Sequence, residues 1–427
     1  MEEQLRVVIS DYSGHPFQVQ LSRELARQGH AVLHLYYKDF QTPKGKLSVD
    51  PLDPDTLAIE SISLNKPFAK QSFLKRRSQE IAVGKKIAER IIGFRPDVVV
   101  GSNLPLDAVR AVTKRCRRAE IPFVFWQQDI YSIAITKILT KKWGPLGALI
   151  GSYYRSVERA ALNSSDQIVA ISPDFVPYLT GQFGVKKKDI TVIENWAPLG
   201  EINPGLKDNP WSRARGLADT DVVLYTGTLG MKHDPGQLLR IARRLSSRPN
   251  TELVVVSEGP AAEWLMKQAL LEGLKTLRVI NFQPFAEYGD VLASANILLC
   301  ILEDSAGAFS VPSKVLSYLC AGRPIVLLAP SENLSVRTIA AADAGISVPS
   351  HSSTELPDAV VHLLNNSTGC SRAGKNGRAY AERAFDIGAL AERFTLVLTS
   401  AIGIKNSSAS IHNRNSSSSA SLSSSAL

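Results

Sequence analysis

The stretch that decides the fold is Val311-Pro312-Ser313-Lys314-Val315-Leu316-Ser317-Tyr318-Leu319-Cys320-Ala321-Gly322-Arg323-Pro324-Ile325-Val326. It predicts a turn, a short helix, a glycine that stops the helix, and a buried strand. Pro312 and Ser313 suit the first turn of the helix, because proline lacks the N–H that this turn leaves unpaired and serine is able to cap it. Gly322 suits the left-handed residue after the helix, and Pro324 prevents the helix from continuing.

The start of this predicted helix is also a candidate site for an anionic group. Free N–H groups and the positive end of the helix dipole lie at residues 311–314, where they favour a phosphate. Lys314 adds a full positive charge one turn into the helix. An ordinary helix–strand unit without a ligand is an equally good interpretation of this stretch taken alone.

Short apolar segments alternate with longer helical ones along the rest of the chain, as in the α/β class. Continuous apolar runs are typical of parallel strands that are covered on both faces. The expected strands are 5–10, 31–36, 97–101, 122–126, 166–171 and 190–193 in the first half, and 222–226, 252–257, 277–282, 297–302, 325–329 and 346–348 in the second. The expected helices include 19–28, 73–92, 106–118, 236–245, 262–272 and 313–319.

These elements predict two doubly wound domains in tandem. A segment rich in Pro and Gly separates the two series, so we expect an N-terminal domain at 1–197, a linker at 198–216 and a C-terminal domain at 217–387. An apolar segment at 388–404 is expected to form a closing helix, and the Ser-rich tail at 405–427 is expected to be disordered. Sheets of this kind bind ligands beyond the carboxyl ends of their strands, so we expect the site in a cleft where the two domains face each other.

The composition is that of a globular protein of 427 residues with a formal net charge of +9. No apolar run approaches the roughly 20 residues of a membrane-spanning helix. The chain begins without the basic and apolar regions of a signal peptide. Four scattered cysteines show no metal-binding spacing, and they are Cys116, Cys300, Cys320 and Cys370. A reduced cytoplasmic location is therefore expected.

The positive charge is concentrated in one part of the first half. Between Ser61 and Glu120, fourteen Lys or Arg residues stand against five Asp or Glu residues. Such a surface attracts nucleic acid, anionic lipid or an anionic soluble ligand, although a merely solvated basic face is the default interpretation. Nucleic acid is not expected as a partner, because no recognised binding motif or interleaved aromatic residues accompany the charge.

Three turns in the second half follow predicted strands and carry candidate ligand-binding residues. The turn at 226–232 has glycines that let a ligand approach the backbone, with a lysine that suits a diphosphate. The turn at 257–260 offers a glutamate for a hydroxyl group, and the third turn is the helix start at 313. Turns of this kind follow many strands, so one of them alone indicates little. The prediction of a ligand-binding site depends on all three turns occurring in one domain and in this order. The candidates are Gly230, Lys232, Glu258, Gly259, Ser313 and Lys314.

Two loops of the first half carry further candidates. The loop 11–16 contains Gly14 and His15 but lacks the GxGxxG fingerprint, so a dinucleotide is disfavoured there. His15 is a candidate donor to a substrate, with a loop-surface role as the alternative. Asp129 follows another strand and is expected at the same edge of the sheet. The alternative for Asp129 is an N-cap of the helix that follows.

The chain resembles the retaining nucleotide-sugar glycosyltransferases of the GT-B fold, family 4, and within them the branch that builds exopolysaccharide and O-antigen of the colanic-acid type. The resemblance covers roughly residues 5–400. It implies two Rossmann-like domains that face a cleft. The matching blocks are Gly29-His30-Ala31-Val32, Val192-Ile193-Glu194-Asn195-Trp196, Tyr225–Lys232, Ser257–Pro260, and Pro312-Ser313-Lys314 through Ala321-Gly322-Arg323-Pro324.

The resemblance implies a role for each candidate. Lys232 and Lys314 would contact the phosphates of the donor, while Glu258, Gly259 and the Phe282–Pro284 segment would lie near the nucleoside. Gly14 and Asp129 would face the transferred sugar and the acceptor, so Asp129 and His15 are the candidate catalytic residues. The donor is expected to be a UDP-sugar and the acceptor a lipid-linked or growing glycan. Neither a metal nor a cofactor is implied, since cationic and helix-end groups offset the charge of the leaving group.

The sequence departs from the common pattern of this family in two places. Many members have two glutamates eight residues apart, whereas here Phe309 stands at the first position and Ser317 at the second, where the ribose would bind. The usual arginine before the phosphate-binding lysine is also absent, with Thr228 nearby. Glu303 and Asp304 are candidate substitutes for the missing groups.

The leading prediction is therefore a hexosyltransferase-type enzyme that moves a sugar in polysaccharide biosynthesis. Two alternatives stay open. The missing glutamates are compatible with an inactive GT-B-like subunit that only binds a nucleotide or glycan, and a sugar-nucleotide epimerase is less favoured because paired carboxylates are missing. The basic helices, together with Lys137–Lys142, Trp143 and Tyr153-Tyr154, suggest an anionic membrane surface as a further partner, on the inner face of the plasma membrane.

Overall fold

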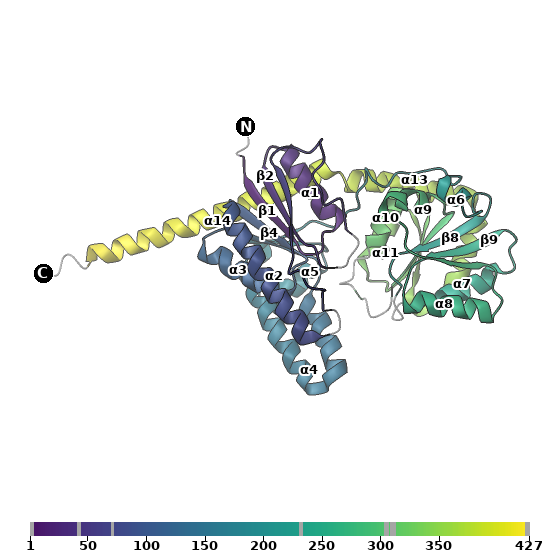
Figure 1. The fold of residues 1–427 in the computed structure, drawn as a ribbon, viewed down its shortest axis with the longest axis horizontal. Helices are drawn as coiled ribbons and strands as arrows, with labels where there is room; N and C mark the ends of the chain where they lie inside the picture. Colours follow the sequence, from purple (N-terminus) through teal and green to yellow (C-terminus); the bar gives the residue numbers. More distant parts are fainter. Residues whose placement is uncertain are drawn as a thin grey trace. The chain divides into compact units, whose positions relative to one another are not determined.

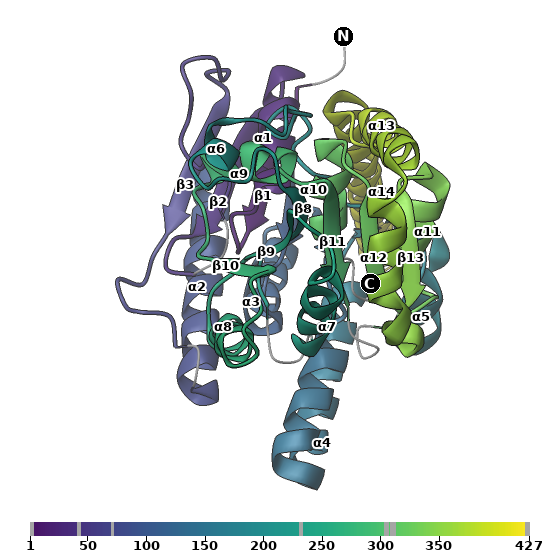
Figure 2. The same cartoon turned by 90° about the vertical axis from the view of Figure 1, so that its right-hand side faces the viewer.

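The computed structural model describes residues 4–40, 44–69, 72–229, 234–302, 307 and 313–422, with side chains up to residue 406. The chain divides into two compact units, one formed by Met1–Glu194 together with Ile387–Leu427 and the other by Asn195–Asp386. Each unit is built on a parallel sheet with helices on both faces (Figures 1 and 2). The predicted α/β class with two doubly wound domains is therefore confirmed.

The sheet of the first unit has, among the described residues, seven strands in the order β3-β2-β1-β4-β5-β6-β7. These strands are β1 (Arg6–Asp11), β2 (Ala31–Tyr37), β3 (Leu57–Ile62), β4 (Val98–Ser102), β5 (Phe123–Gln127), β6 (Gln167–Ala170) and β7 (Ile190–Val192). The helices are α1 (Pro16–Arg27), α2 (Phe73–Phe94), α3 (Leu106–Arg118), α4 (Tyr131–Asn163), α5 (Phe175–Phe183) and α14 (Ile387–Leu422). Helices α1 and α14 pack together on one face of this sheet, and α2, α3 and α4 pack on the other (Figure 1).

The sheet of the second unit has, within the part of the chain that is described, the strand order β10-β9-β8-β11-β12-β13. These strands are β8 (Asp221–Thr226), β9 (Thr251–Val256), β10 (Leu277–Ile280), β11 (Ile297–Ile301), β12 (Ile325–Ala329) and β13 (Gly345–Pro349). The helices are α6 (Pro210–Arg213), α7 (Gly236–Leu245), α8 (Pro260–Leu271), α9 (Tyr288–Ala293), α10 (Ser313–Ala321), α11 (Leu334–Ala342), α12 (Leu356–Leu364) and α13 (Ser367–Ala384). Helices α7, α8 and α12 cover one face, and α9, α10, α11 and α13 the other.

The central strands are buried because both faces of each sheet are covered. Every residue of β4, β5, β11 and β12 is buried, which explains their continuous apolar runs. In each sheet the strand order reverses at one point, between β1 and β4 and between β8 and β11. Ligands of doubly wound sheets bind at such points, beyond the carboxyl ends of the strands. The loops after these four strands therefore locate one candidate site in each unit.

Three sequence expectations need correction. Strand β3 was not expected, because an edge strand with half-buried, mixed residues lacks a continuous apolar run. The expected linker 198–216 is part of the second unit, where α6 begins with a capping box at Asn209 and Trp211 is buried. Helix α14 continues to Leu422 instead of ending near residue 404, so the expected disordered tail begins within a helix.

Helices α13 and α14 account for an apolar stretch in the C-terminal region. By length and composition alone, Ser367–Asn406 is able to cross a membrane. In the structure, α13 ends at Ala384 and α14 begins at Ile387. Leu390, Phe394 and Leu398 of α14 are buried, and the Phe394 ring lies 4.7 Å from the Trp126 ring of β5. These three residues of α14 thus serve as core of the first unit, whereas Leu396 of the same helix is 70% exposed.

Helix α4 is a helical hairpin whose two arms meet at Gly144. Gly144 has φ +56° and ψ −130°, a conformation that only glycine adopts readily, and Pro145 begins the second arm. The arms pack closely through glycines, because a Cβ at Gly147 would lie 2.0 Å from the Leu139 carbonyl oxygen. The tip of α4 extends away from the sheet of its unit (Figures 1 and 2).

Candidate functional site

Lys314 lies at the carboxyl end of β8, beside the loop that follows this strand. Its Nζ donates a hydrogen bond of 2.6 Å to the Tyr225 hydroxyl and one of 3.3 Å to the Thr228 carbonyl oxygen. It also lies 4.0 Å from the centre of the Tyr225 ring. Burial lowers the pKa of Lys314 to about 8. A half-buried ammonium group at a topological switch point, without an acidic partner among the described residues, is suited to an anionic ligand.

Gly227 brings the backbone close to this lysine. Its φ of +101° lies in the region that favours glycine, and an added Cβ would lie 2.8 Å from Lys314 Cε. The loop after β8 and the first turn of α10 are therefore in direct contact. The sequence predicted both as phosphate-binding turns but gave no sign of the Tyr225 hydroxyl that holds the lysine.

Replacing Gly227 by alanine should destabilise the protein and displace Lys314. The left-handed conformation costs a non-glycine residue on the order of 1–3 kcal/mol, and the new methyl group pushes the lysine away from Tyr225. Urea denaturation measures the loss. Gly200→Ala is the matched control, since a Cβ added at Gly200 would meet no atom within 4 Å, and it is expected to change stability by less than about 0.5 kcal/mol. Equal effects of the two substitutions would contradict the argument.

Glu258 and Phe282 join the loops that follow β9 and β10. Glu258 is exposed, and its Oε1 accepts a 3.0 Å hydrogen bond from the Phe282 backbone N–H. Gly259 has φ +98° and is the N-cap of α8. The Phe282 side chain is also exposed. One carboxylate oxygen of Glu258 thus orders the neighbouring loop, and an apolar ring lies on the same side of the sheet.

Ser317 lies one turn after Lys314 on α10 and faces Tyr288. Burial raises the pKa of Tyr288, and the Thr226 and Ser317 side chains oppose the rise. The expected role of Ser317 at a ribose stays a prediction. Ser313 is the first residue of α10 and is exposed.

Several sequence predictions lie outside the described residues. They are Gly230, Lys232, Glu303, Asp304, Phe309 and the helix-start residues Val311 and Pro312. Their roles stay predictions.

In the first unit, Asp11 organises the loop after β1. Its carboxylate accepts hydrogen bonds from the Ser13 N–H at 3.0 Å and from the His15 N–H at 2.7 Å. Asn103, which follows β4, donates to the same carboxylate at 3.3 Å. Burial raises the pKa of Asp11 to about 7, while these donors oppose the rise. Asp11 therefore links the two loops at the switch point of this sheet.

Gly14 and His15 take their positions from this arrangement. Gly14 has φ +74°, and His15 is the N-cap residue of α1 without a side-chain cap hydrogen bond. The His15 ring stacks on Phe17 at 6.0 Å. The sequence named Gly14 and His15 but missed Asp11 and Asn103. The available signal was an Asp followed by Gly after a strand, since Asp side chains accept from the N–H two residues on.

Asp129 follows β5 but does not cap α4. The N-cap position is Ile130, and the first N–H groups of the helix, those of Tyr131 and Ser132, donate to the Glu158 carboxylate at 3.0 and 2.9 Å. The N-cap interpretation of Asp129 is therefore wrong. Desolvation raises the pKa of Asp129 to about 6, although its side chain reaches solvent. Its carboxylate has no hydrogen-bond partner within the described part of the chain, so it is available to a ligand.

No metal site is evident among the described residues, in which no three His, Cys, Asp or Glu side chains gather as ligands. Among the described residues, the second unit thus offers a half-buried lysine, glycine turns and hydroxyl groups, and the first unit offers two carboxylates of raised pKa.

The two units match two family models in sequence. Residues 17–200 match the model described as Glycosyltransferase Family 4, and residues 220–366 match the model described as Glycosyl transferases group 1. Both halves of the chain thus match models of glycosyltransferase families, and its fold is that of the GT-B glycosyltransferases. No curated protein matches it significantly in sequence.

Several solved structures share the architecture of this chain. HepE from Anabaena, solved in complex with UDP and glucose, aligns with a TM-score of 0.65 and 14% identity over 93% of this chain and 100% of that one. WaaG, a glycosyltransferase involved in lipopolysaccharide biosynthesis, aligns with a TM-score of 0.66 and 16% identity over 92% of this chain and 99% of that one. A putative UDP-N-acetylglucosamine 2-epimerase from Listeria monocytogenes aligns with a TM-score of 0.61 and 15% identity over 93% of this chain and 96% of that one. At these identities the likeness concerns the fold.

Proposed function

We propose that this glycosyltransferase transfers a hexose or amino sugar from a UDP-sugar to a lipid-linked or growing glycan, with retention at the anomeric carbon. Structures of HepE with UDP and with UDP-glucose support the choice of donor. WaaG supports an acceptor in surface polysaccharide synthesis, because that enzyme is involved in lipopolysaccharide biosynthesis. We place the enzyme in the cytoplasm, at the inner face of the plasma membrane.

The observation that carries the proposal is the position of Lys314. It lies under the glycine turn after β8, where the diphosphate of a donor would meet both an ammonium group and backbone N–H groups. With a pKa of about 8, Lys314 is mostly protonated at pH 7, and a bound diphosphate favours the charged form further. Such a group stabilises UDP as it departs with its negative charge.

In the proposed reaction the acceptor hydroxyl attacks the anomeric carbon on the face from which UDP leaves. The bond between this carbon and the phosphate oxygen breaks, and the acceptor proton passes to that oxygen. Lys314 and Lys232 offset the charge of the diphosphate, so the proposal requires no metal ion. Asp129 and His15 orient the transferred sugar and the acceptor, and Gly14 faces them. Glu258, Gly259 and Phe282 lie toward the nucleoside.

Thermal unfolding with a panel of nucleoside diphosphates tests this function. UDP at about a hundred times its Kd should add roughly 2.7 kcal/mol of stability, a rise of about 5–10 °C for a unit of this size, and ADP or GDP should add less. The same preparation must release UDP from a UDP-sugar when an acceptor is present. Stabilisation by UDP without any turnover would favour the inactive-subunit alternative, and absence of any nucleotide effect would contradict both.

A further inference from the structure

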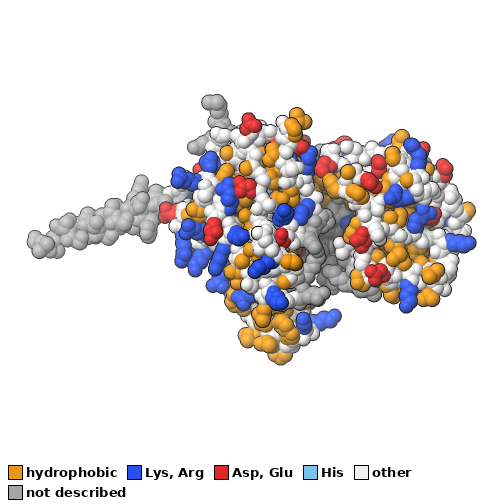
Figure 3. Space-filling model, in the orientation of Figure 1, with side chains coloured by type: hydrophobic (Ala, Val, Ile, Leu, Met, Phe, Trp, Pro, Cys, Tyr) orange, Lys and Arg blue, Asp and Glu red, His pale blue; other side chains and the backbone are white. Residues whose placement is uncertain are grey.

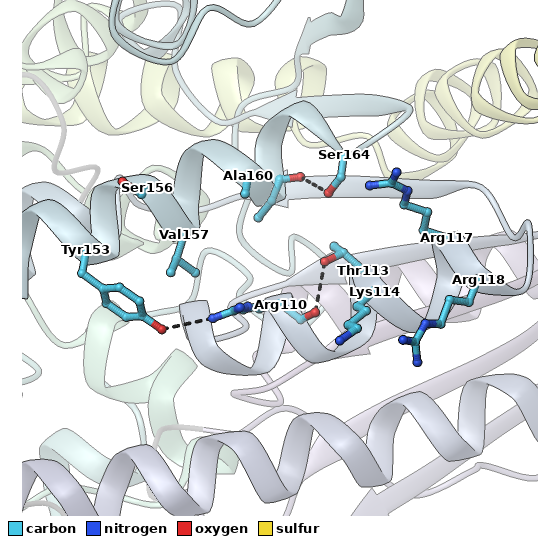
Figure 4. A pocket seen from close by; sticks show the side chains of 11 residues that line it. Arg110, Thr113, Lys114, Arg117, Arg118, Tyr153, Ser156, Val157, Ala160 and Ser164 are labelled. Atoms are coloured by element: carbon cyan, nitrogen blue, oxygen red, sulfur yellow. Dashed lines mark hydrogen bonds between the residues drawn. The ribbon is translucent and has the colours of Figure 1, made fainter.

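A basic groove lies between α3 and the second arm of α4, on the first unit (Figure 4). Its volume is about 650 Å³. One wall is formed by α3 and carries cations, whereas the other wall is formed by the second arm of α4 and carries small or apolar side chains. The lining residues are Arg110, Thr113, Lys114, Arg117, Arg118, Tyr153, Ser156, Val157, Ala160, Ala161 and Ser164.

The cations of this groove are available to a ligand. Arg110, Lys114, Arg117 and Arg118 lie on one face of α3 and are exposed. Arg110 donates to the Tyr153 hydroxyl at 3.1 Å, but none of the four forms an ion pair with a described residue. No acidic side chain lines the groove. The groove therefore combines uncompensated positive charge with an apolar wall, which suits an anionic amphiphile.

The apolar wall continues along the second arm of α4 toward the tip of the hairpin. Leu146, Leu149, Tyr153, Val157 and Ala160 follow one another at intervals of three or four residues, so they share one face of the arm. Leu146 is 59% exposed and Leu149 69% exposed. Figure 3 shows hydrophobic side chains gathered at the tip of α4, next to the basic surface of the same unit.

The first arm adds a similar surface. Ile138 is 64% exposed, and Lys137, Lys141 and Lys142 surround it. Between Ile130 and Val157 the sequence contains no Asp or Glu. This segment thus combines exposed leucine and isoleucine with neighbouring lysines and contains no acidic residue. Such a pattern is typical of segments that lie in the interface of an anionic membrane.

Side-chain contacts hold the base of the α4 hairpin beside the groove. Asp107 of α3 accepts a 2.8 Å hydrogen bond from Tyr154 and pairs with Arg77 of α2 at 3.3 Å. Arg77 also donates to the Tyr153 hydroxyl at 3.0 Å. These contacts fix the base of the second arm of α4 against α2 and α3. The exposed tip is therefore presented from a stable base.

We propose that this groove binds the phosphate headgroup of an anionic membrane phospholipid while the tip of the α4 hairpin enters the membrane interface. The cations of α3 pair with the phosphate, and the apolar wall and tip lie against the glycerol and acyl region. A nucleic acid would pair with the cations but would leave the exposed leucines in water. The inference is independent of sugar transfer, since it concerns neither Lys314 nor Asp129.

Co-sedimentation of the full chain with lipid vesicles tests the proposal. The wild type should bind vesicles of phosphatidylcholine mixed with phosphatidylglycerol, and bind pure phosphatidylcholine at least tenfold less. Binding should weaken as salt rises from about 0.1 M to 1 M, because the Debye length falls from about 10 Å to 3 Å. The triple variant with Lys114→Gln, Arg117→Gln and Arg118→Gln should bind these vesicles at least tenfold more weakly, because each positive charge near an anionic surface strengthens binding.

Matched variants separate the two parts of the surface from general effects. The double variant Leu146→Ser, Leu149→Ser should also lose at least tenfold in vesicle affinity. The control Leu52→Ser, at an exposed leucine elsewhere on the unit, should lose less than about twofold in the same affinity. Gln at Lys186, Lys187 and Lys188 removes the same charge as the groove variant from a different exposed surface and should have a similarly small effect. UDP-induced stabilisation should persist in all of them.

Four outcomes would overturn the proposal. The first is that the wild type does not bind vesicles that contain phosphatidylglycerol. The second is that the groove variant and the Lys186–Lys188 variant lose the same vesicle affinity, and the third is that the leucine variant loses none. The fourth is release of the protein from vesicles by inorganic phosphate, which would assign the groove to a soluble anion. Failure of these tests with intact UDP stabilisation would leave the proposed sugar transfer standing.

Discussion

Replacing Lys314 by alanine is expected to weaken UDP binding by about 10- to 100-fold. A hydrogen bond from a charged donor contributes about 1.5–3 kcal/mol, and Lys314 is the described cation that lies at the turn after β8. The rise in Tm that UDP produces should therefore largely disappear at a UDP concentration that saturates the wild type. Isothermal titration calorimetry measures the same loss as a change in Kd.

The pH dependence of UDP binding is a second test of Lys314. Burial lowers the pKa of Lys314 to about 8, so its charge is lost as pH rises through that value. UDP affinity of the wild type should fall as pH rises above about 8, while the alanine variant should show no such fall. Lys375→Ala is the control, because Lys375 is exposed on α13 of the same unit. Full UDP stabilisation in the Lys314 variant would remove the phosphate contact from the proposal.

The elements around Lys314 in the second unit were predictable because their signals are local. The helix start at Ser313, the glycine stop at Gly322 and the buried strand after it all depend on neighbours within a few positions. Lys314 could be named from that pattern alone. Its hydrogen bond to Tyr225 could not be predicted from the sequence. The two residues are 89 positions apart, and only the folded unit brings them together.

The first unit shows what local patterns miss. Asp11 and Asn103 meet through the pairing of β1 with β4, and Glu158 caps the start of α4 from the end of the same hairpin. Each contact joins residues far apart in sequence. The hairpin itself was missed because Gly144 and Pro145 are typical of a loop, and because its exposed apolar residues do not follow the pattern of a surface helix.

The N-cap assignment of Asp129 failed for a related physical reason, and its failure has a consequence. The first N–H groups of α4 donate to Glu158, whereas no described N–H group donates to the Asp129 carboxylate, whose pKa desolvation raises to about 6. Since Glu158 satisfies the helix start, Asp129 is not needed for it. A carboxylate that the fold does not use is a candidate for binding or catalysis.

Replacing Asp129 by asparagine should therefore lower kcat about 100- to 1,000-fold while leaving UDP-induced stabilisation intact. Loss of one charged group that acts on the transition state has an effect of this size. Asparagine keeps the shape of the side chain, and no described hydrogen bond of the fold is broken. Steady-state rates of UDP release, measured over a range of acceptor concentrations, separate kcat from KM.

The wild-type rate should also depend on pH through this residue. With a pKa of about 6, Asp129 is ionised at pH 7 and becomes protonated as pH falls below 6, so kcat should fall there. The asparagine variant should lack this acidic limb. Asp55→Asn, at an exposed aspartate elsewhere on the unit, should behave as wild type. An asparagine variant that keeps both its rate and its acidic limb would show that Asp129 takes no part in transfer, and would return the catalytic role to groups such as His15.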